Sequence, residues 1–167
     1  MVPTVSFKLL YALIIVRLER RVLVLVNATA NPTTRWVSQQ ITEAFPWDEA
    51  PRYLIRDRDS IYGLVFRRRL GAVGIRGRPI AFRCPWRNAY AERLIGSIRR
   101  ECLDHVVVFG EQHLRQTLSE YAGYNNTART HLALSKDAPV SRKTTAVGVI
   151  QAHPILGGLH HLYSRVS

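Results

Sequence analysis

Two apolar runs near the N-terminus constrain the fold most strongly. Residues 7–16 and 22–27 are rich in Val, Leu and Ile, and a charged turn at residues 17–21 separates them. Aliphatic runs of this length, joined by so short a polar connection, are typical of an antiparallel hairpin. We therefore expect the chain to begin with two paired strands.

Helical periodicity follows the hairpin. Residues 31–34 offer a helix start with Thr33 or Thr34 as the cap, and apolar side chains recur at helical spacing to about Phe45. The predicted elements after this helix are a strand at 53–55, a helix at 64–73, a strand at 75–81, and helices at 88–105 and 111–126. This order predicts an α/β layer architecture.

Two predicted segments carry more specific expectations. In the helix at 64–73, Leu64, Val65, Leu70 and Val73 are expected to point inward and residues 67–69 outward. Beyond Pro139 the pattern is weak, and we predict an irregular tail.

Charge is the outlier of the composition. Lys and Arg total 24 against 12 acidic residues, which gives a formal net charge of +12. Nearly all of the positive charge is Arg, whose planar fork fits phosphates in a bidentate manner. A chain this basic attracts polyanions, of which nucleic acid is the commonest.

Cysteine usage and hydropathy indicate the compartment. Cys84 and Cys102 lack disulfide or metal-ligand spacing, and Cys102 falls on the apolar face of a helix. The apolar run at 9–16 is too short to span a bilayer, and charged residues interrupt it at once. We expect a cytoplasmic protein that is not inserted in a membrane.

Two acidic residues stand in settings that suit metal-dependent phosphoryl transfer. Asp57 closes the predicted strand within Asp57-Arg58-Asp59-Ser60-Ile61-Tyr62, and Glu92 opens a helix within Pro85-Trp86-Arg87-Asn88-Ala89-Tyr90-Ala91-Glu92-Arg93. Both stretches resemble motifs of bacterial insertion-sequence transposases. Residues 124–126 and 129–134 are similar to that family's Tyr-Asn…Arg-x-His-x-x-Leu segment. Together the motifs resemble an integrase or transposase catalytic core of the Asp-Asp-Glu class.

The resemblance implies fold and chemistry. It implies a ribonuclease-H-like fold, a mixed sheet with helices on both faces, over residues 1–139, followed by a C-terminal tail at 140–167. It also implies DNA integration or transposition by metal-dependent phosphodiester cleavage and strand transfer. Asp57 and Glu92 would be catalytic and would ligate Mg²⁺ or Mn²⁺, hard cations that prefer oxygen.

The same resemblance and the charge pattern assign the remaining site residues. Those expected to contact DNA are Trp86, Asn88, Arg93, Arg99 and Arg100. Asp59 is interpreted as a surface acid paired with Arg56 or Arg58, with an accessory metal role as the alternative. For His131 we favour a structural role over phosphate binding.

One expected residue has no counterpart. The family's first Asp lies on the first strand, and residues 1–7 resemble the sequence that follows it. The first acid here is Glu19, in the charged turn. We therefore expect the missing Asp a few positions upstream of Met1, impaired metal binding, and no useful catalysis by this chain alone.

Three functional hypotheses follow. The first is a transposase core that lacks the start of its first strand. It would act on transposon ends and target DNA, either as a homo-oligomer or with full-length transposase. The second is a non-catalytic DNA-binding relic or an inhibitory partner of full-length transposase. The third, a ribonuclease-H-type nuclease acting on RNA, is disfavoured by the motif around Glu92.

Overall fold

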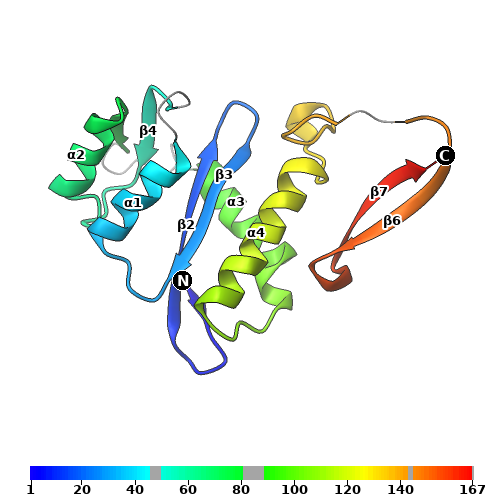
Figure 1. The fold of residues 1–167 in the computed structure, drawn as a ribbon, viewed down its shortest axis with the longest axis horizontal. Coiled ribbons are helices and arrows are strands. Elements are labelled where there is room, and N and C mark those ends of the chain that lie inside the picture. Colours follow the sequence, from blue (N-terminus) through cyan, green and yellow to red (C-terminus); the bar gives the residue numbers. More distant parts are fainter. Residues whose placement is uncertain (46–49, 81–88, 143–144, 167) are drawn as a thin grey trace.

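Helices and strands are mixed along the chain (Figure 1). The computed structural model describes residues 1–45, 50–80, 89–142 and 145–166. The strands are β1 (Val2–Pro3), β2 (Leu9–Arg17), β3 (Val22–Thr29), β4 (Tyr53–Arg56), β5 (Arg76–Pro79), β6 (Val149–Ile155) and β7 (His160–Val166). The helices are α1 (Thr34–Ala44), α2 (Leu64–Ala72), α3 (Ala89–Glu101) and α4 (Glu111–Thr127), and short 3₁₀ turns cover Leu103–His105, Leu132–Leu134 and Leu156–Gly158.

The predicted N-terminal hairpin is confirmed. β2 and β3 pair in an antiparallel register from Tyr11↔Thr29 to Arg17↔Val22, with an irregularity between Ile15 and Val16. β1 adds a short third strand on the other edge of β2.

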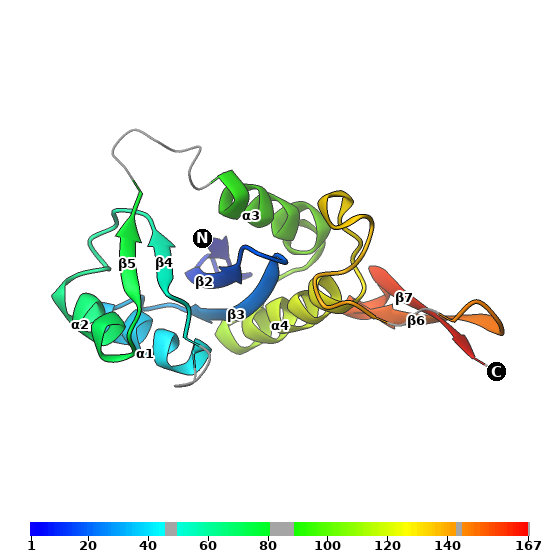
Figure 2. The ribbon, with the colours of Figure 1, turned by 90° about the horizontal axis from the view of Figure 1, so that it is seen from above.

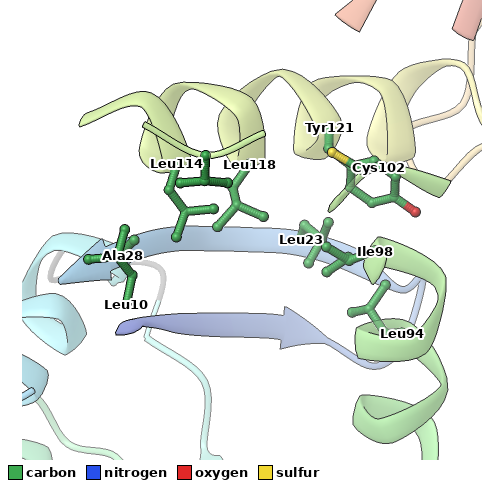
Figure 3. Close-up of a cluster of buried hydrophobic side chains, with 10 residues drawn as sticks. Leu10, Leu23, Ala28, Leu94, Ile98, Cys102, Leu114, Leu118 and Tyr121 are labelled. Carbon is green, nitrogen blue, oxygen red and sulfur yellow. The ribbon is translucent and has the colours of Figure 1, made fainter. Parts of the chain in front are cut away.

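Both faces of the β2–β3 hairpin are covered by helices. Leu10, Leu23 and Ala28 pack with α3 and α4, as Figure 3 shows, whereas Ile15 packs with α1 and α2. Leu10 and Ile15 can face opposite layers because side chains alternate between the two faces of a strand. The hairpin thus forms the middle layer of the molecule.

The expected single mixed sheet is divided among the described residues. β4 and β5 pair in parallel from Tyr53↔Arg76 to Arg56↔Pro79, separately from the β1–β2–β3 sheet. Figure 2 shows β4 and β5 beside α1 and α2.

Helix α1 begins as the sequence predicts. The Thr33 side chain accepts a hydrogen bond from the Trp36 backbone N–H at 3.1 Å, which satisfies one of the free donors of the first turn. The predicted helix at 88–105 is shorter, because α3 ends at Glu101 and a 3₁₀ turn continues the chain to His105.

The inward face predicted for α2 is partly wrong. Leu64 and Val65 are exposed, whereas Phe66 and Leu70 are fully buried and residues 67–69 point outward as expected. Phe66 packs edge-on against Tyr62, with ring centroids 4.9 Å apart. This aromatic contact rotates the buried face of the helix away from Leu64.

The C-terminal prediction is also wrong. Residues 149–166 form the antiparallel hairpin β6–β7, on the far side of α4 from β4 and α2 (Figure 1). Its apolar residues were overlooked because they stay exposed. Val149 is 73% exposed and Ile150 59%, so no buried periodicity marks the strands.

Candidate nucleic-acid and metal site

Asp57 and Asp59 follow β4 but hold different hydrogen-bond partners. Asp57 is exposed, and among the described residues its Oδ1 accepts a long 3.4 Å hydrogen bond from the Asp59 backbone N–H. The Oδ1 of Asp59 accepts from the Ile61 backbone N–H at 2.9 Å and from the Ser60 hydroxyl at 3.4 Å. Asp59 therefore stabilises the turn, as aspartates commonly do through their own backbone.

The pairing expected of Asp59 with an arginine is wrong. Arg56 donates from Nη1 to the Asp57 backbone oxygen at 2.9 Å, and Arg58 donates from Nε to the Ile80 oxygen at 2.7 Å. Both guanidinium groups thus fix the backbone at the end of β4. This arrangement leaves the Asp57 carboxylate available at the surface.

Tyr62 lies beside this acidic turn. Burial, together with the charges of Asp57 and Asp59, raises the pKa of Tyr62 to about 12, against the opposing charge of Arg56. The Arg56 guanidinium lies 5.1 Å from the centre of the Tyr62 ring, in a cation–π contact. Tyr62 therefore keeps its proton at neutral pH. The sequence reasoning missed this residue, although a tyrosine three residues after Asp59 was visible in the motif.

Helix α3 carries the second predicted acid. Glu92 is exposed in the first turn, while Leu94, Ile98 and Cys102 turn inward, which confirms the apolar face predicted for Cys102. Burial raises the pKa of the Cys102 thiol to about 11, so it stays protonated and unreactive. A carboxylate in a first helical turn is favoured by the helix dipole.

The arginines of α3 lie on its exposed surface. Arg93, Arg99 and Arg100 all reach solvent, and residues seven apart on a helix share a face. Glu92 and Arg99 therefore form one row, and Arg93 and Arg100 form the next. Arg100 folds back over Gly96, where an added Cβ would lie 3.0 Å from its Nη1. Trp86, Asn88 and Cys84 lie outside the described residues.

A cavity of about 570 Å³ is lined by residues from β4 and from α3, the two elements that carry or precede the predicted acids. Asp57 contributes to its lining, and so do Tyr90 and Ala91 of α3, but the adjacent Glu92 does not. Within the described parts of the chain, no group of three or more His, Cys, Asp or Glu side chains could hold a metal ion. Asp57 thus lines a cavity that α3 also borders, and the described residues form no metal-binding cluster there.

A second arginine-rich feature was not predicted from the sequence. The guanidinium groups of Arg52 and Arg78 each lie 5.3 Å from the centre of the Tyr53 ring. Tyr53 and Arg78 also line a cavity of about 600 Å³ at the exposed side of β4 and β5. The signal in the sequence was the alternation Arg76-Gly77-Arg78, which places two exposed arginines on one strand.

A third acid, Glu101, is fully engaged. It accepts hydrogen bonds from Arg129 Nε at 2.8 Å, Arg129 Nη2 at 2.6 Å and the Tyr121 hydroxyl at 2.9 Å. Burial alone would raise the pKa of Glu101, but hydrogen bonds from Arg129 and Tyr121 outweigh it and the pKa is lowered. This group joins the end of α3 to α4.

His131 belongs to the same region. It is 7% exposed, its backbone pairs with Asp137, and its Nδ1 lies 3.2 Å from Arg129 Nη1. Burial and the nearby Arg129 charge lower the pKa of His131. The buried position agrees with the structural role that we favoured.

A comparison with known families finds one similarity that covers α3 and α4. Residues 73–139 match the family model of the integrase core domain. This segment is similar to an integrase core domain, which supports a relationship to integrase and transposase catalytic cores. It contains Glu92, the arginines of α3 and the Glu101–Arg129 pair, whereas Asp57 precedes it.

A comparison with curated proteins and a check for membrane-spanning helices complete these findings. No curated protein matches the chain. Integrase core domains generally act on DNA and use divalent metal ions. In the residues that the structure describes, none of the helices is long and apolar enough to cross a membrane.

Proposed function

We propose that this chain is the DNA-binding core of a transposase, descended from enzymes that cleave and join phosphodiester bonds. The observation that carries this proposal is the integrase core match, which includes α3 with Glu92 and its exposed arginines. Backbone phosphates are the ligands that such arginines bind best. The order hairpin, α1, β4, α2, β5, α3 supports a ribonuclease-H-like fold.

The carboxylates present do not fit a two-metal centre. Asp57 and Glu92 offer the oxygen donors that Mg²⁺ prefers, and both are exposed. Asp59, the remaining acid at the end of β4, already accepts hydrogen bonds from Ile61 and Ser60. We therefore propose that the chain alone binds divalent metal weakly and binds DNA without cleaving it.

The DNA interface is tested by the salt dependence of binding. The affinity of the full chain for a DNA duplex is measured by fluorescence anisotropy between 50 and 200 mM salt, for the wild type and for Arg93→Gln/Arg100→Gln. Each phosphate contact contributes a slope of about 0.9 in log affinity against log salt, so the double variant should lose about 1.8.

Arg35→Gln is the matched control, because Arg35 is an exposed arginine of α1 outside the integrase core segment. Its affinity and slope should stay close to those of the wild type. Equal losses in the control and in the double variant, or binding that ignores salt, would refute an interface at α3.

Catalysis is tested separately. The wild type and Asp57→Ala are incubated with a labelled DNA duplex in Mg²⁺ or Mn²⁺, and strand nicking is followed on a denaturing gel. We expect no nicking above background in either protein. Robust nicking by the wild type that Asp57→Ala abolishes would show that the two acids suffice for catalysis, and our proposal of inactivity would be wrong.

A further inference from the structure

One face of the β4–β5 sheet combines an aromatic ring with arginines. Tyr53 of β4 lies opposite Arg76 of β5 in the parallel register. Two residues further along each strand, Ile55 lies opposite Arg78. Because residues two apart on a strand share a face, all four side chains project from the same side of this sheet.

The other side of the same sheet is covered. Leu54 packs in the buried cluster that α1 and α2 form, and a Cβ added at Gly77 would lie 3.0 Å from Leu70 Cδ1 of α2. Figure 2 shows β4 and β5 beside these two helices. Tyr53, in contrast, is 41% exposed and Ile55 51%. The side of the sheet that carries Tyr53 is therefore the accessible one.

Two positive charges lie beside the Tyr53 ring. The guanidinium groups of Arg52 and Arg78 are each 5.3 Å from its centre, and the side chains of Arg52, Arg76 and Arg78 are exposed. Within the described parts of the chain, none of these three arginines takes part in a salt bridge. Like charges held this close repel each other, so an anion that contacts both groups is favoured. We call Arg52, Tyr53, Arg76 and Arg78 the arginine–tyrosine face.

A cavity on this face adds an apolar surface to the charges. Tyr53, Ile55, Pro79 and Ile80 line about 600 Å³ together with Arg78. This volume falls within the usual range of about 300–1,000 Å³ for small-molecule sites. The lining suits a flat, largely apolar ring that carries a phosphate, because bases stack on tyrosine and on guanidinium planes while arginine binds phosphate. A nucleotide unit has this chemistry.

The charge and the aromatic ring together name the ligand class. We propose that the arginine–tyrosine face binds a single strand of nucleic acid. Its bases stack against Tyr53 and the adjacent guanidinium groups, and its phosphates contact Arg76 and Arg78. Bases within a duplex are stacked on one another and cannot offer their faces to a side chain, so the strand is single. This site lies on different elements from the arginines of α3 and does not depend on the DNA interface proposed there.

Substitution of Tyr53 tests the stacking. A fluorescein-labelled oligothymidylate of about twelve nucleotides is titrated with the full chain, and binding is followed by fluorescence anisotropy. Tyr53→Leu should weaken binding about tenfold, whereas Tyr53→Phe should stay within about twofold of the wild type, because the ring is kept. Tyr163→Leu is the matched control, since Tyr163 is a 59% exposed tyrosine on β7. Its affinity should equal that of the wild type.

The arginines are tested by salt dependence. Each phosphate contact on a single strand contributes a slope of about 0.7 in log affinity against log salt, so Arg76→Gln/Arg78→Gln should lose about 1.4. Arg67→Gln/Arg68→Gln removes the same charge from exposed arginines of α2 and serves as the control. The slope of the control should change little.

Photocrosslinking of the wild type locates the strand without any substitution. An oligonucleotide that carries 5-iodouracil is irradiated in complex with the full chain, and the crosslinked peptide is identified by mass spectrometry. We expect the crosslink at Tyr53. The same titration with oligouridylate tells whether DNA or RNA is the tighter strand, and binding of either supports the site.

The outcomes separate this site from the DNA interface at α3. Tyr53→Leu should leave duplex affinity unchanged, whereas Arg93→Gln/Arg100→Gln should lower it. Failure of the second result alone contradicts the proposed function and leaves the arginine–tyrosine face standing. The inference is overturned if single strands do not bind, if Tyr53→Leu binds them as tightly as Tyr53→Phe, or if it weakens duplex and single strand equally. A charge control that loses as much slope as the β5 variant, or a crosslink that maps outside residues 52–55 and 76–80, would overturn it as well.

Discussion

Helix α3 carries two glutamates, nine residues apart, with opposite environments. Glu92 is exposed in the first turn and forms no salt bridge within the described part of the chain, whereas Glu101 accepts three hydrogen bonds from Arg129 and Tyr121. One helix thus holds an acid that remains available to ligands and an acid committed to the fold.

The difference separates an exposed side chain from one that supports the fold. Glu101 and Arg129 are both about one-quarter exposed, and their ion pair ties α3 to the chain after α4. Breaking such a pair leaves an uncompensated charge in a partly buried place. Among the described residues Glu92 has no comparable ion pair, so its replacement should cost little stability.

The largest predicted effect is the difference in stability between two single alanine substitutions, one at each glutamate. Glu101→Ala removes three hydrogen bonds and leaves Arg129 unpaired, so we expect a loss of about 3 kcal/mol in the free energy of unfolding. Glu92→Ala should change it by less than about 0.5 kcal/mol, as is usual at exposed positions. Urea denaturation followed by circular dichroism measures both values. Similar losses in the two variants would mean that the contrast between the acids does not govern stability.

Acid should weaken the supporting region in two steps. The pKa of His131 is lowered from 6.5, so the stability that it contributes is present above about pH 6.5 and is lost as the pH falls through its folded pKa. The pKa of Glu101 is lowered from 4.5, so its contribution is lost in the same direction but below about pH 4.5.

Substitution should remove each step in turn. The difference in unfolding free energy between pH 7 and pH 5 should shrink in His131→Gln, and the difference between pH 5 and pH 3 should shrink in Glu101→Gln. Denaturant titrations at these pH values provide the comparison. A His131→Gln chain that keeps the full loss between pH 7 and pH 5 would assign that loss to other groups.

Local sequence predicted the elements whose signals are local. Thr33 caps α1 as expected, and the β2–β3 hairpin follows its two apolar runs. The buried face of α2 was predicted correctly for Leu70 and incorrectly for Leu64 and Val65, and the Tyr62–Phe66 contact involves a residue outside the helix. The β6–β7 hairpin escaped prediction because its apolar residues remain exposed and have no buried periodicity.

The candidate site was predictable to a similar degree. Motif spacing predicts Asp57 and Glu92 as site residues, and the integrase core match covers the position of the second. Asp57 and Asp59 differ in their hydrogen bonds. Motif spacing does not reveal this difference, because it arises where the Asp59 carboxylate accepts from the Ile61 backbone N–H. The cavity lined by β2 and β4 depends on the packing of distant segments, which a single sequence does not specify.

The smallest predicted effect concerns Gly96, one turn after Glu92 on the exposed side of α3. Glycine inside a helix is about 1 kcal/mol less favourable than alanine, so Gly96→Ala should gain part of that amount. The new Cβ would lie 3.0 Å from Arg100 Nη1, the end of a flexible side chain that can turn away at small cost. We therefore expect a net gain of about 0.5 kcal/mol and a displaced Arg100.

Gly123→Ala on α4 is the matched control, because its added Cβ meets nothing within 4 Å. It should give the full gain of about 1 kcal/mol. Thermal unfolding of the two variants measures the difference, which is the cost of moving Arg100 away from the row beside Glu92. If Gly96→Ala proves less stable than the wild type, then Arg100 is held over Gly96 more firmly than its exposure suggests. The region around Glu92 would then be as fixed as the region around Glu101.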